Sequence, residues 1–337
     1  MSAARVFAVD EDAAQLVEGS NIFDVPLDDA RVGGRRVAGP PGRLIGKFAT
    51  ISDIHIGEPG FGLLPRVSEP RSRSGDDHYT VRATRAAIEE AVAWGAELIV
   101  VKGDITWLAR PAQWERAAAV LAAAPVPIVA LVGNHDVVRR GQHGRPWLED
   151  AGISTIVDDD DPVATVDIAG VRLVLAATTH DHHSPGLFRQ ATLDATLAGL
   201  ETPDALGSIL LMHHYPNRFV VPTRYPAGIV RDDAARLFDR LADLDHPPTL
   251  VTCGHSHRNR RYRRSGIDVS EVGSTKDFAG VWAGYSIHEG GVRQVVRRIA
   301  EPDVVEWIEK TKRSCLGLWG EWTPGLLRWR CFSLPWR

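Results

Sequence analysis

The chain has 337 residues, of which 44% are hydrophobic, and a formal net charge of -4 at pH 7. This length and composition suffice for one large α/β domain with a sizeable core, or for one domain with extensions. The negative charge argues against nonspecific binding of nucleic acid or of an anionic membrane through a bulk field, although it leaves room for a local basic patch.

The N-terminus lacks an apolar core of signal-peptide length, and no segment is long and apolar enough to span a bilayer. The three cysteines fit neither a disulfide framework nor a Cys-x-x-Cys zinc motif. We therefore expect a soluble, cytoplasmic protein with free thiols.

Residues 1–46 form an N-terminal extension that could supply edge strands or be partly disordered. The first predicted strand covers Lys47–Ser52 and ends at Asp53-Ile54-His55. Residues two apart in an extended strand end point the same way, so Asp53 and His55 can share one cation. The loop that follows contains three arginines that could meet an anionic substrate or lie on a solvated surface, namely Arg66, Arg71 and Arg73.

The next segments predict a β-α-β-α-β unit. Apolar residues at helical spacing predict helices over 79–94 and 112–123. Buried strands are predicted over 97–102, which ends at Gly103-Asp104, and over 127–132, which ends at Gly133-Asn134-His135-Asp136. Such crossovers give parallel, right-handed connections, and sheets of this kind bind ligands at the carboxyl ends of their strands.

The second half of the chain continues with alternating elements. Short strands over 153–157, 163–168 and 171–178 lead to a histidine-rich segment, 180–183, that could rim the pocket. A helix over 186–200 precedes the strand 208–212, which ends at His213-His214, and a helix over 231–244 precedes the strand 249–253, which ends at Gly254-His255-Ser256-His257. Residues 266–298 are predicted to be meandering strands with a hairpin turn at Gly290-Gly291.

The C-terminal tail, 300–337, contains five tryptophans with Leu and Arg between them, which are Trp307, Trp319, Trp322, Trp329 and Trp336. Such a tail could be a lid, a contact in a homo-oligomer, an interfacial membrane patch or an aromatic arm packed on its own domain.

Five predicted strand ends carry seven side chains of metal-binding type, which are Asp53, His55, Asp104, Asn134, His213, His255 and His257. Each one alone would be explained better as a hydrogen-bonded structural residue. Their shared position after apolar runs, with glycine before three of the clusters, indicates one metal centre instead. Nitrogen and oxygen donors without thiolate suit Mn, Fe, Zn or Co.

These motifs resemble, in order and roughly in spacing, the signature of the calcineurin-like metallophosphoesterases over about residues 46–298. The resemblance implies a four-layer αββα sandwich, an α/β fold with two mixed sheets flanked by helices, for residues 47–299. It also implies two divalent ions, with Asp104 bridging them. Asp53, His55, Asp104 and His257 would hold one ion, and Asp104, Asn134, His213 and His255 would hold the other.

The same resemblance implies a hydrolase in which a metal-bridging hydroxide attacks a small phosphate ester. Two divalent ions about 4 Å apart lower the pKa of a bridging water and stabilise both the attacking and the leaving oxygen. His135 would stabilise or protonate the leaving oxygen, and Asn134, His135 and His214 would contact substrate. His213 is a better ligand candidate than His214, because it directly follows the apolar run.

One position departs from the family pattern. Many members carry an acid three residues after the Gly-Asp aspartate, where it orients the catalytic histidine, whereas this chain has Trp107. Either Asp136 or Asp76 takes that role, or His135 works without an orienting carboxylate.

The His-His-x-Pro run at 213–216 and the Gly-His-Ser-His element look most like the bacterial branch of cyclic-nucleotide and glycerophosphodiester phosphodiesterases. This similarity implies a phosphodiesterase. A phosphomonoesterase acting on a small metabolite or a phosphoprotein is the main alternative, and a non-catalytic scaffold of the same fold is a third. A nuclease is not expected, because no basic groove is evident.

Overall fold

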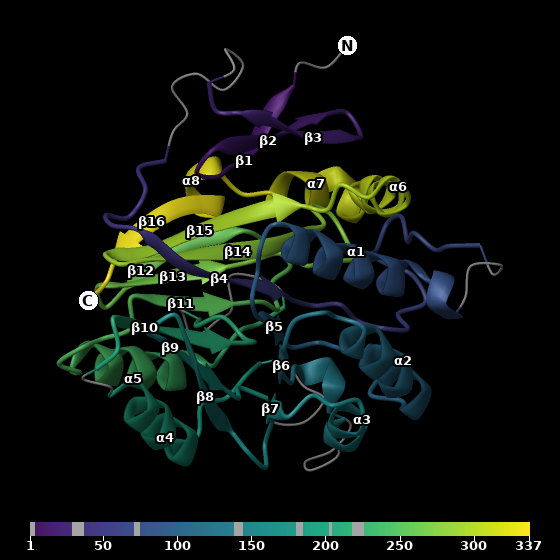
Figure 1. Cartoon of the computed structure of the whole chain (residues 1–337). Helices are drawn as coiled ribbons and strands as arrows, with labels where there is room; N and C mark the ends of the chain where they lie inside the picture. The colour runs from purple at the N-terminus through teal and green to yellow at the C-terminus, as the bar shows by residue number, and fades with distance from the viewer. Residues whose placement is uncertain are drawn as a thin grey trace.

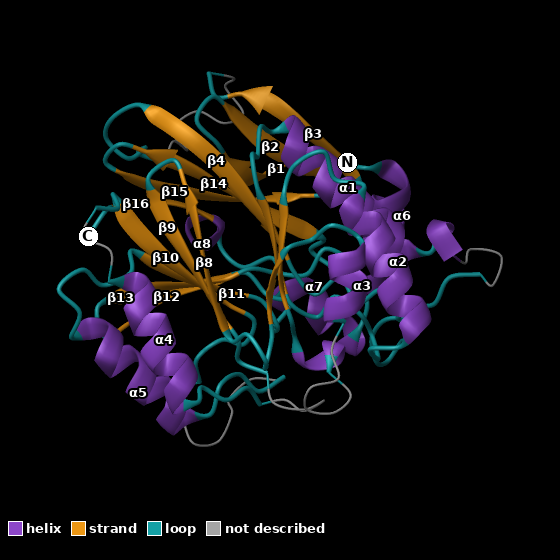
Figure 2. Cartoon of the chain, turned by 60° about the horizontal axis from the view of Figure 1, so that its bottom comes forward, coloured by secondary structure: helices purple, strands orange, loops and turns teal. Residues whose placement is uncertain are grey.

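The computed structural model of the chain describes residues 4–28, 37–70, 75–137, 144–179, 185–201, 204–217 and 226–337. The expectations for Arg71, Arg73 and the histidine-rich segment 180–183 lie outside these residues, as does the side chain of Asp76. The described elements form two mixed sheets that face each other, with helices on both outer sides (Figures 1 and 2). The α/β sandwich expected from the resemblance is therefore confirmed.

The larger sheet has seven strands in the order β16-β15-β14-β4-β5-β6-β7. Its parallel half is the predicted β-α-β-α-β unit, which consists of β4 (Leu44–Ile51), α1 (Tyr79–Ala93), β5 (Ile99–Lys102), α2 (Pro111–Ala122) and β6 (Ile128–Leu131). The short helix α3 (Arg145–Asp150) leads to β7 (Thr155–Val157), which extends this half. The other half is antiparallel and contains β14 (Val281–His288), β15 (Gly291–Arg298) and β16 (Cys331–Pro335).

The second sheet has six strands, in the order β12 (Arg260–Arg264), β13 (Ile267–Glu271), β11 (Leu250–Cys253), β10 (Gly207–Met212), β9 (Val171–Ala176) and β8 (Val163–Ile168). Helices α4 (Gln190–Leu200) and α5 (Arg231–Ala242) cover its outer face (Figure 2).

The predicted meander over 266–298 is wrong in part. β13 runs parallel to β11 in the six-stranded sheet, whereas β14 and β15 form an antiparallel hairpin in the seven-stranded sheet. Both β13 and β14 are buried along their whole length. A strand buried on both faces has no polar side to reveal its neighbours, so the sequence pattern did not show that the chain changes sheets here.

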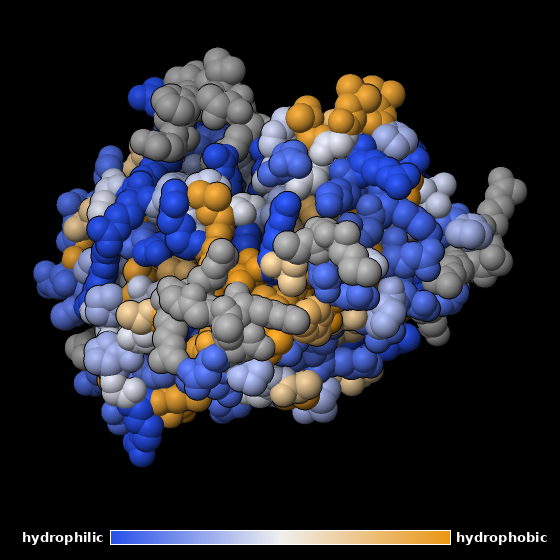
Figure 3. All heavy atoms as spheres, turned by 90° about the horizontal axis from the view of Figure 1, so that it is seen from above, coloured by the Kyte–Doolittle hydropathy of each residue, from blue (hydrophilic) through white to orange (hydrophobic). Residues whose placement is uncertain are grey.

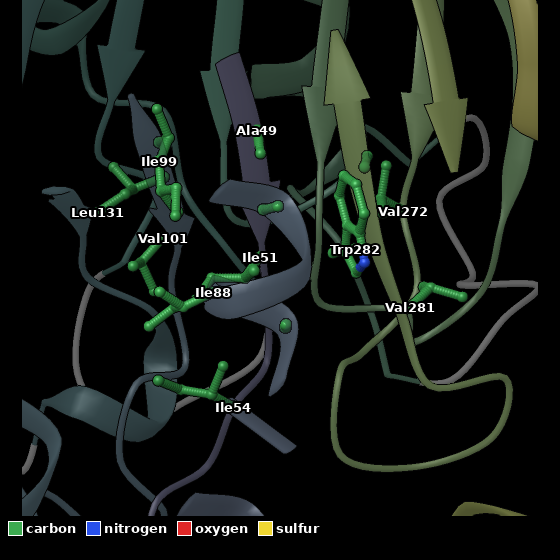
Figure 4. Packing of buried hydrophobic residues seen from close by; sticks show 14 of the residues in the cluster. Ala49, Ile51, Ile54, Ile88, Ile99, Val101, Leu131, Val272, Val281 and Trp282 are labelled. Atoms are coloured by element: carbon green, nitrogen blue, oxygen red, sulfur yellow. The ribbon is translucent and has the colours of Figure 1, made fainter. Parts of the chain in front are cut away.

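Alternate side chains of the central strands enter two separate cores. Leu173 and Leu175 of β9 point into the core between the sheets, whereas Val174 and Ala176 pack under α4 and α5. On the outer face of the seven-stranded sheet, hydrophobic residues pack between this sheet and α1, where Ile88 lies near Ile51 and Val101 (Figure 4). Burial on both faces explains why these strands read as continuous apolar runs.

Residues 5–26 form a third, antiparallel sheet, which consists of β1 (Arg5–Val9), β2 (Ala13–Glu18) and β3 (Asn21–Pro26). This small sheet lies over β15 and is not an edge of either large sheet (Figure 1). The amide of Gln15 donates to the Arg298 carbonyl at 2.9 Å and accepts from the Arg298 N–H at 2.8 Å, which connects the two sheets.

The segment after residue 300 packs onto the rest of the chain. It forms α6 (Pro302–Thr311), a 3-10 turn (Cys315–Gly317), α7 (Leu318–Trp322), α8 (Leu327–Arg330) and β16. Trp307 stacks on Tyr79 of α1 with 3.8 Å between the ring centroids, and β16 pairs with β15. Among the described residues, no helix has the length and the apolar character that crossing a membrane requires.

Candidate metal centre

The seven predicted ligands converge where the carboxyl ends of strands from both sheets meet. Asp53 and His55 follow β4, Asp104 follows β5 and Asn134 follows β6, while His213 follows β10 and His255 and His257 follow β11. All are buried except His257, whose side chain retains an exposure of 12%. The site therefore lies between the sheets, at one edge of the sandwich.

One group of donors consists of Asp53, His55 and His257, whose metal-binding atoms lie within 4.8 Å of one another. His257 Nε2 is 3.4 Å from Asp53 Oδ1, and His55 Nε2 is 3.4 Å from Asp104 Oδ2. A second group surrounds His213 Nε2, which lies 3.3 Å from Asp104 Oδ1, 3.3 Å from Asn134 Oδ1 and 3.2 Å from His255 Nδ1. One carboxylate oxygen of Asp104 thus faces the first group, and the other oxygen faces the second group.

The outward nitrogens of three histidines are engaged by protein oxygens. His213 Nδ1 donates to the Lys102 carbonyl at 2.7 Å, His255 Nε2 donates to the Ala227 carbonyl at 3.0 Å, and His257 Nδ1 lies 2.7 Å from Asp277 Oδ2. Bonds of this type fix the tautomer so that the inner nitrogen presents a lone pair.

His55 provides the clearest test of whether metal ions fit. It is 2% exposed, and neither of its ring nitrogens has a hydrogen-bond partner among the described residues. A buried imidazole that makes no hydrogen bond is costly unless another group binds it. With nitrogen and oxygen donors on all sides, the residues present fit divalent transition-metal ions.

The carboxylates and imidazoles of the site attract one another strongly. Burial raises the pKa of Asp104, but His213 and His135 outweigh burial and hold this pKa well below its usual range. Burial lowers the pKa of His213, but Asp104 and Asp53 outweigh burial and raise this pKa to about 9. The buried carboxylates of the site therefore favour positive charge beside them.

Five of the seven ligand candidates have a left-handed backbone conformation. The φ angles are 55° at Asp53, 45° at His55, 51° at Asp104, 64° at His255 and 52° at His257. Such conformations are unfavourable for residues with a Cβ, and they concentrate at functional sites, where the surrounding structure holds them.

Two glycines beside the ligands are required by close approach of the backbone. A Cβ on Gly133 would lie 2.3 Å from Asp104 Oδ1, and a Cβ on Gly254 would lie 2.0 Å from Ser52 Oγ. Neither position can carry a side chain without moving a ligand or its neighbour. This close approach is the physical reason for the glycines that precede the ligand motifs in the sequence.

His135 is oriented by a backbone carbonyl. Its Nδ1 donates to the Trp107 carbonyl at 2.9 Å, and its ring stacks on the Trp107 indole with 4.7 Å between centroids. The carboxylate of Asp136 instead accepts hydrogen bonds from the N–H groups of Ile105, Thr106 and Gly133, and so it holds the two ligand loops together. Trp107 therefore contacts His135 through its carbonyl and its indole, and no carboxylate at this position takes part.

His214 lies beside the ligand candidates His213 and His255. It is fully buried, its Nδ1 is 2.8 Å from Thr178 Oγ1, and its ring centroid is 4.3 Å from that of His255. His214 forms a group with His213 and His255 that could hold a metal ion, and its Nε2 has no hydrogen-bond partner among the described residues, so its contact with substrate stays a prediction.

Sequence reasoning missed a buried group around Asp277. Asp277 contacts His257, accepts a hydrogen bond from Trp319 Nε1 at 3.0 Å and lies 3.3 Å from Lys276 Nζ, which in turn pairs with Glu58 at 2.6 Å. The loop that carries Asp277 follows β13 at the same sheet edge as the ligands. Asp277 lies six residues after the end of β13, so no strand-end pattern in the sequence indicated it.

The solved structures that resemble this chain include two phosphatases. A dimetal phosphatase from Danio rerio has 16% sequence identity and a TM-score of 0.57, over 77% of this chain and 98% of that chain. A purple acid phosphatase from yellow lupin (Lupinus luteus) has 13% identity and a TM-score of 0.52, over 86% of this chain and 57% of that chain. At these identities the similarity shows a shared fold.

The family model of calcineurin-like phosphoesterases matches residues 46–259, which is more than half of the chain and spans β4 to the last ligand candidate. The chain belongs to the calcineurin-like phosphoesterase family.

Proposed function

We propose that this chain is a phosphodiesterase that works with two divalent metal ions. The observation that carries the proposal is the arrangement around Asp104, which directs Oδ2 toward His55 at 3.4 Å and Oδ1 toward His213 at 3.3 Å. A carboxylate with one oxygen in each of two donor groups suits a bridging ligand.

Asp53, His55, Asp104 and His257 would hold one ion, and Asp104, Asn134, His213 and His255 the other. Ions bound there would supply positive charge for the phosphoryl group and lower the pKa of bound water. The chain itself fixes the inner nitrogens of the histidines through their outward hydrogen bonds, so the donors need little rearrangement to bind.

His135 would transfer a proton to the leaving oxygen. It is less buried than most of the ligands, and its ring centroid lies 4.6 Å from that of His55. Because Nδ1 donates to the Trp107 carbonyl, the transferred proton would pass through Nε2. The stacked indole of Trp107 restricts rotation of the imidazole.

A phosphodiester is the preferred substrate because it carries less negative charge than a dianionic phosphomonoester. Two buried lysines beside the ligands are already engaged: Lys276 by Glu58 and Asp277, and Lys102 by Thr252 and the Cys253 carbonyl. Neither ammonium group is therefore available to a dianionic monoester. The His-His-x-Pro and Gly-His-Ser-His motifs point the same way. A phosphomonoesterase is the second candidate, favoured by the similarity to the dimetal phosphatase.

The test is a substrate panel on metal-free protein reconstituted separately with Mn and with Zn. We expect hydrolysis of bis-p-nitrophenyl phosphate to exceed that of p-nitrophenyl phosphate, with no activity before metal is added. The reverse order of substrates would assign a monoesterase.

Asp104→Asn is the matched variant, because it keeps the shape of the side chain and removes the bridging charge. We expect a loss of turnover of about a hundredfold or more, since both donor groups lose an anionic ligand. Full turnover in a metal-loaded Asp104→Asn sample would contradict the bridging role of Asp104. No turnover in the wild-type protein with any substrate would favour the non-catalytic scaffold.

A further inference from the structure

Five of the eight large hydrophobic side chains that are exposed in the described residues come from two short segments. They are Leu63, Leu64, Leu316, Leu318 and Trp322, with exposures of 73%, 71%, 80%, 46% and 46%. Viewed from above, the surface is mostly hydrophilic, and hydrophobic atoms protrude from it in only a few places (Figure 3). Single exposed leucines are ordinary, but a group of them indicates an interaction surface. We refer to these five residues as the apolar rim.

Backbone hydrogen bonds join the two segments of the apolar rim. The N–H of Cys315 donates to the Leu63 carbonyl at 2.7 Å, and the N–H of Leu316 donates to the Leu64 carbonyl at 2.8 Å. Ser314 Oγ accepts from the Leu63 N–H at 3.0 Å. Leu63, Leu64 and Leu316 are therefore neighbours, although about 250 residues separate them in sequence.

Leu64 and Leu316 are exposed from an unfavourable backbone conformation. Leu64, Cys315 and Leu316 have φ angles of 50°, 52° and 59°, in the left-handed region. This region is uncommon for bulky residues and persists where surrounding contacts impose it. The fold thus keeps apolar side chains exposed at a conformational cost, which is expected where the exposed side chains have a use.

The apolar rim adjoins the metal centre. The ring of Phe61 lies 5.4 Å from the Trp319 ring and 6.4 Å from the His257 ring, measured between centroids. Trp319 lies in α7 and donates to Asp277, while Leu318 and Trp322, four residues apart, share another face of that helix. A surface bound by the rim would therefore lie close to the metal ligands.

Basic residues surround the apolar rim. Arg66 lies two residues after Leu64, Arg313 lies three residues before Leu316, and the guanidinium of Arg258 is 5.2 Å from the Trp322 ring. Arg66 and Arg313 are exposed, and neither has an ion-pair partner within the part of the chain that the structure describes. One acid, Glu321, is exposed on α7. Leucines beside arginines favour the boundary between lipid headgroups and acyl chains.

We propose that the apolar rim is a docking site for an anionic lipid bilayer, with the leucines inserted below the headgroups and Arg66 and Arg313 against lipid phosphates. The net negative charge of the chain excludes only attraction through a bulk field, and this basic patch is local. Contact with a second copy is disfavoured, because a two-fold contact through the rim would bring the arginines of the two copies together. The proposal concerns binding alone and does not require catalysis.

The test is co-sedimentation of the full chain with vesicles of phosphatidylcholine, with or without phosphatidylglycerol. We expect binding to the anionic vesicles, weaker binding to the neutral ones, and release at high salt. A variant with Leu63→Ser, Leu64→Asn and Leu316→Asn should bind at least about tenfold more weakly, because it removes three insertable side chains. Asn accepts a left-handed backbone, so the fold should be kept. Arg66→Gln and Arg313→Gln should each weaken binding about fivefold.

Leu206→Ser is the matched control, since Leu206 is an exposed leucine outside the rim, and it should bind as the wild type does. Circular dichroism checks that every variant is folded. A wild-type chain that stays in solution with both kinds of vesicle overturns the proposal, and so does equal binding by the triple leucine variant. A wild-type dimer that this variant converts to monomers would assign the rim to a second copy, which also overturns it.

Discussion

His257 is oriented by Asp277, a buried carboxylate that is itself held by two further side chains. Burial raises the pKa of Asp277, but His257 and Lys276 outweigh burial and lower this pKa to about 2. Trp319 Nε1 donates to the other carboxylate oxygen, Oδ1, at 3.0 Å. A carboxylate fixed in this way keeps the Nδ1 proton of His257 on its own side, so that Nε2 faces Asp53.

Replacement of Asp277 by Asn should weaken metal binding about 10- to 100-fold, because the neutral amide no longer orients His257 or increases its basicity. Calorimetric titration of Mn or Zn into metal-free protein measures this loss. Trp319→Phe removes one donor to Asp277 and should cause a smaller loss in the same direction.

Trp336→Phe is the control for Trp319→Phe, because Trp336 donates to the His288 carbonyl and contacts no ligand candidate. It should bind metal like the wild type. Wild-type affinity in Asp277→Asn would mean that the carboxylate only supports the local fold.

Removal of the His135 imidazole should affect the departure of poor leaving groups most. We expect His135→Ala to retain both metal ions and to lower the rate about a hundredfold or more for diesters with alkyl leaving groups. The loss should be much smaller for p-nitrophenolate, which leaves without a proton. Rates across a series of leaving groups test this, and equal slowing along the series would argue against proton donation by His135.

At the scale of single elements, α1 begins at a histidine that must be neutral to cap it. His78 Nδ1 accepts from the Thr80 N–H, and burial, together with Arg116 and Arg82, lowers the pKa of His78 from 6.5 despite the opposite effect of Glu69. The unfolded chain therefore binds a proton at His78 more tightly than the folded chain does. This contribution to stability is complete above pH 6.5, the ordinary pKa, and is lost as the pH falls from there through the lowered pKa of the folded chain.

His78→Asn should remove this acid sensitivity, because an asparagine side chain caps the helix at any pH. At about pH 8 the variant should match the wild type within a few tenths of a kcal/mol, and at about pH 5 it should be the more stable of the two. Urea unfolding at both pH values measures the difference. A constant difference between the two proteins would show that protonation of His78 does not affect the cap.

The elements that the sequence predicted best are strands buried on both faces. β5, β6, β10 and β11 are short apolar runs bounded by glycine or proline, and each ends at a ligand candidate. α4 begins at Gln190, four residues later than predicted, because the N–H groups of Leu187 and Phe188 bond to Thr178 and Asp233 instead of starting a helix. Such contacts between distant segments leave no local pattern in the sequence.

At the scale of the whole molecule, the convergence of the seven ligand candidates was predictable because each follows the carboxyl end of one of five strands. Asp277 and Trp319 could not be found in this way. Asp277 reaches the centre only because the chain passes from one sheet to the other after β13. Trp319 reaches it only because the segment after residue 300 folds back along α1 and β15.

Substitutions in the last strand, β16, test whether the C-terminal segment stabilises the fold without affecting catalysis. Phe332 is 3% exposed, lies in the main core and is covered by the Arg261 guanidinium at 4.0 Å from its ring. Phe332→Ala should lower the free energy of unfolding by about 3 to 5 kcal/mol, because it leaves a cavity beside β15. Ser333→Ala on the same strand, whose side chain is only partly buried, should change the free energy of unfolding by less than about 0.5 kcal/mol.

Urea unfolding measures the stability of both variants, and turnover of the folded Phe332→Ala protein well below its melting temperature should equal that of the wild type. Wild-type stability in Phe332→Ala would mean that β16 adds little to the fold, and a loss of turnover without a loss of stability would tie β16 to the metal centre.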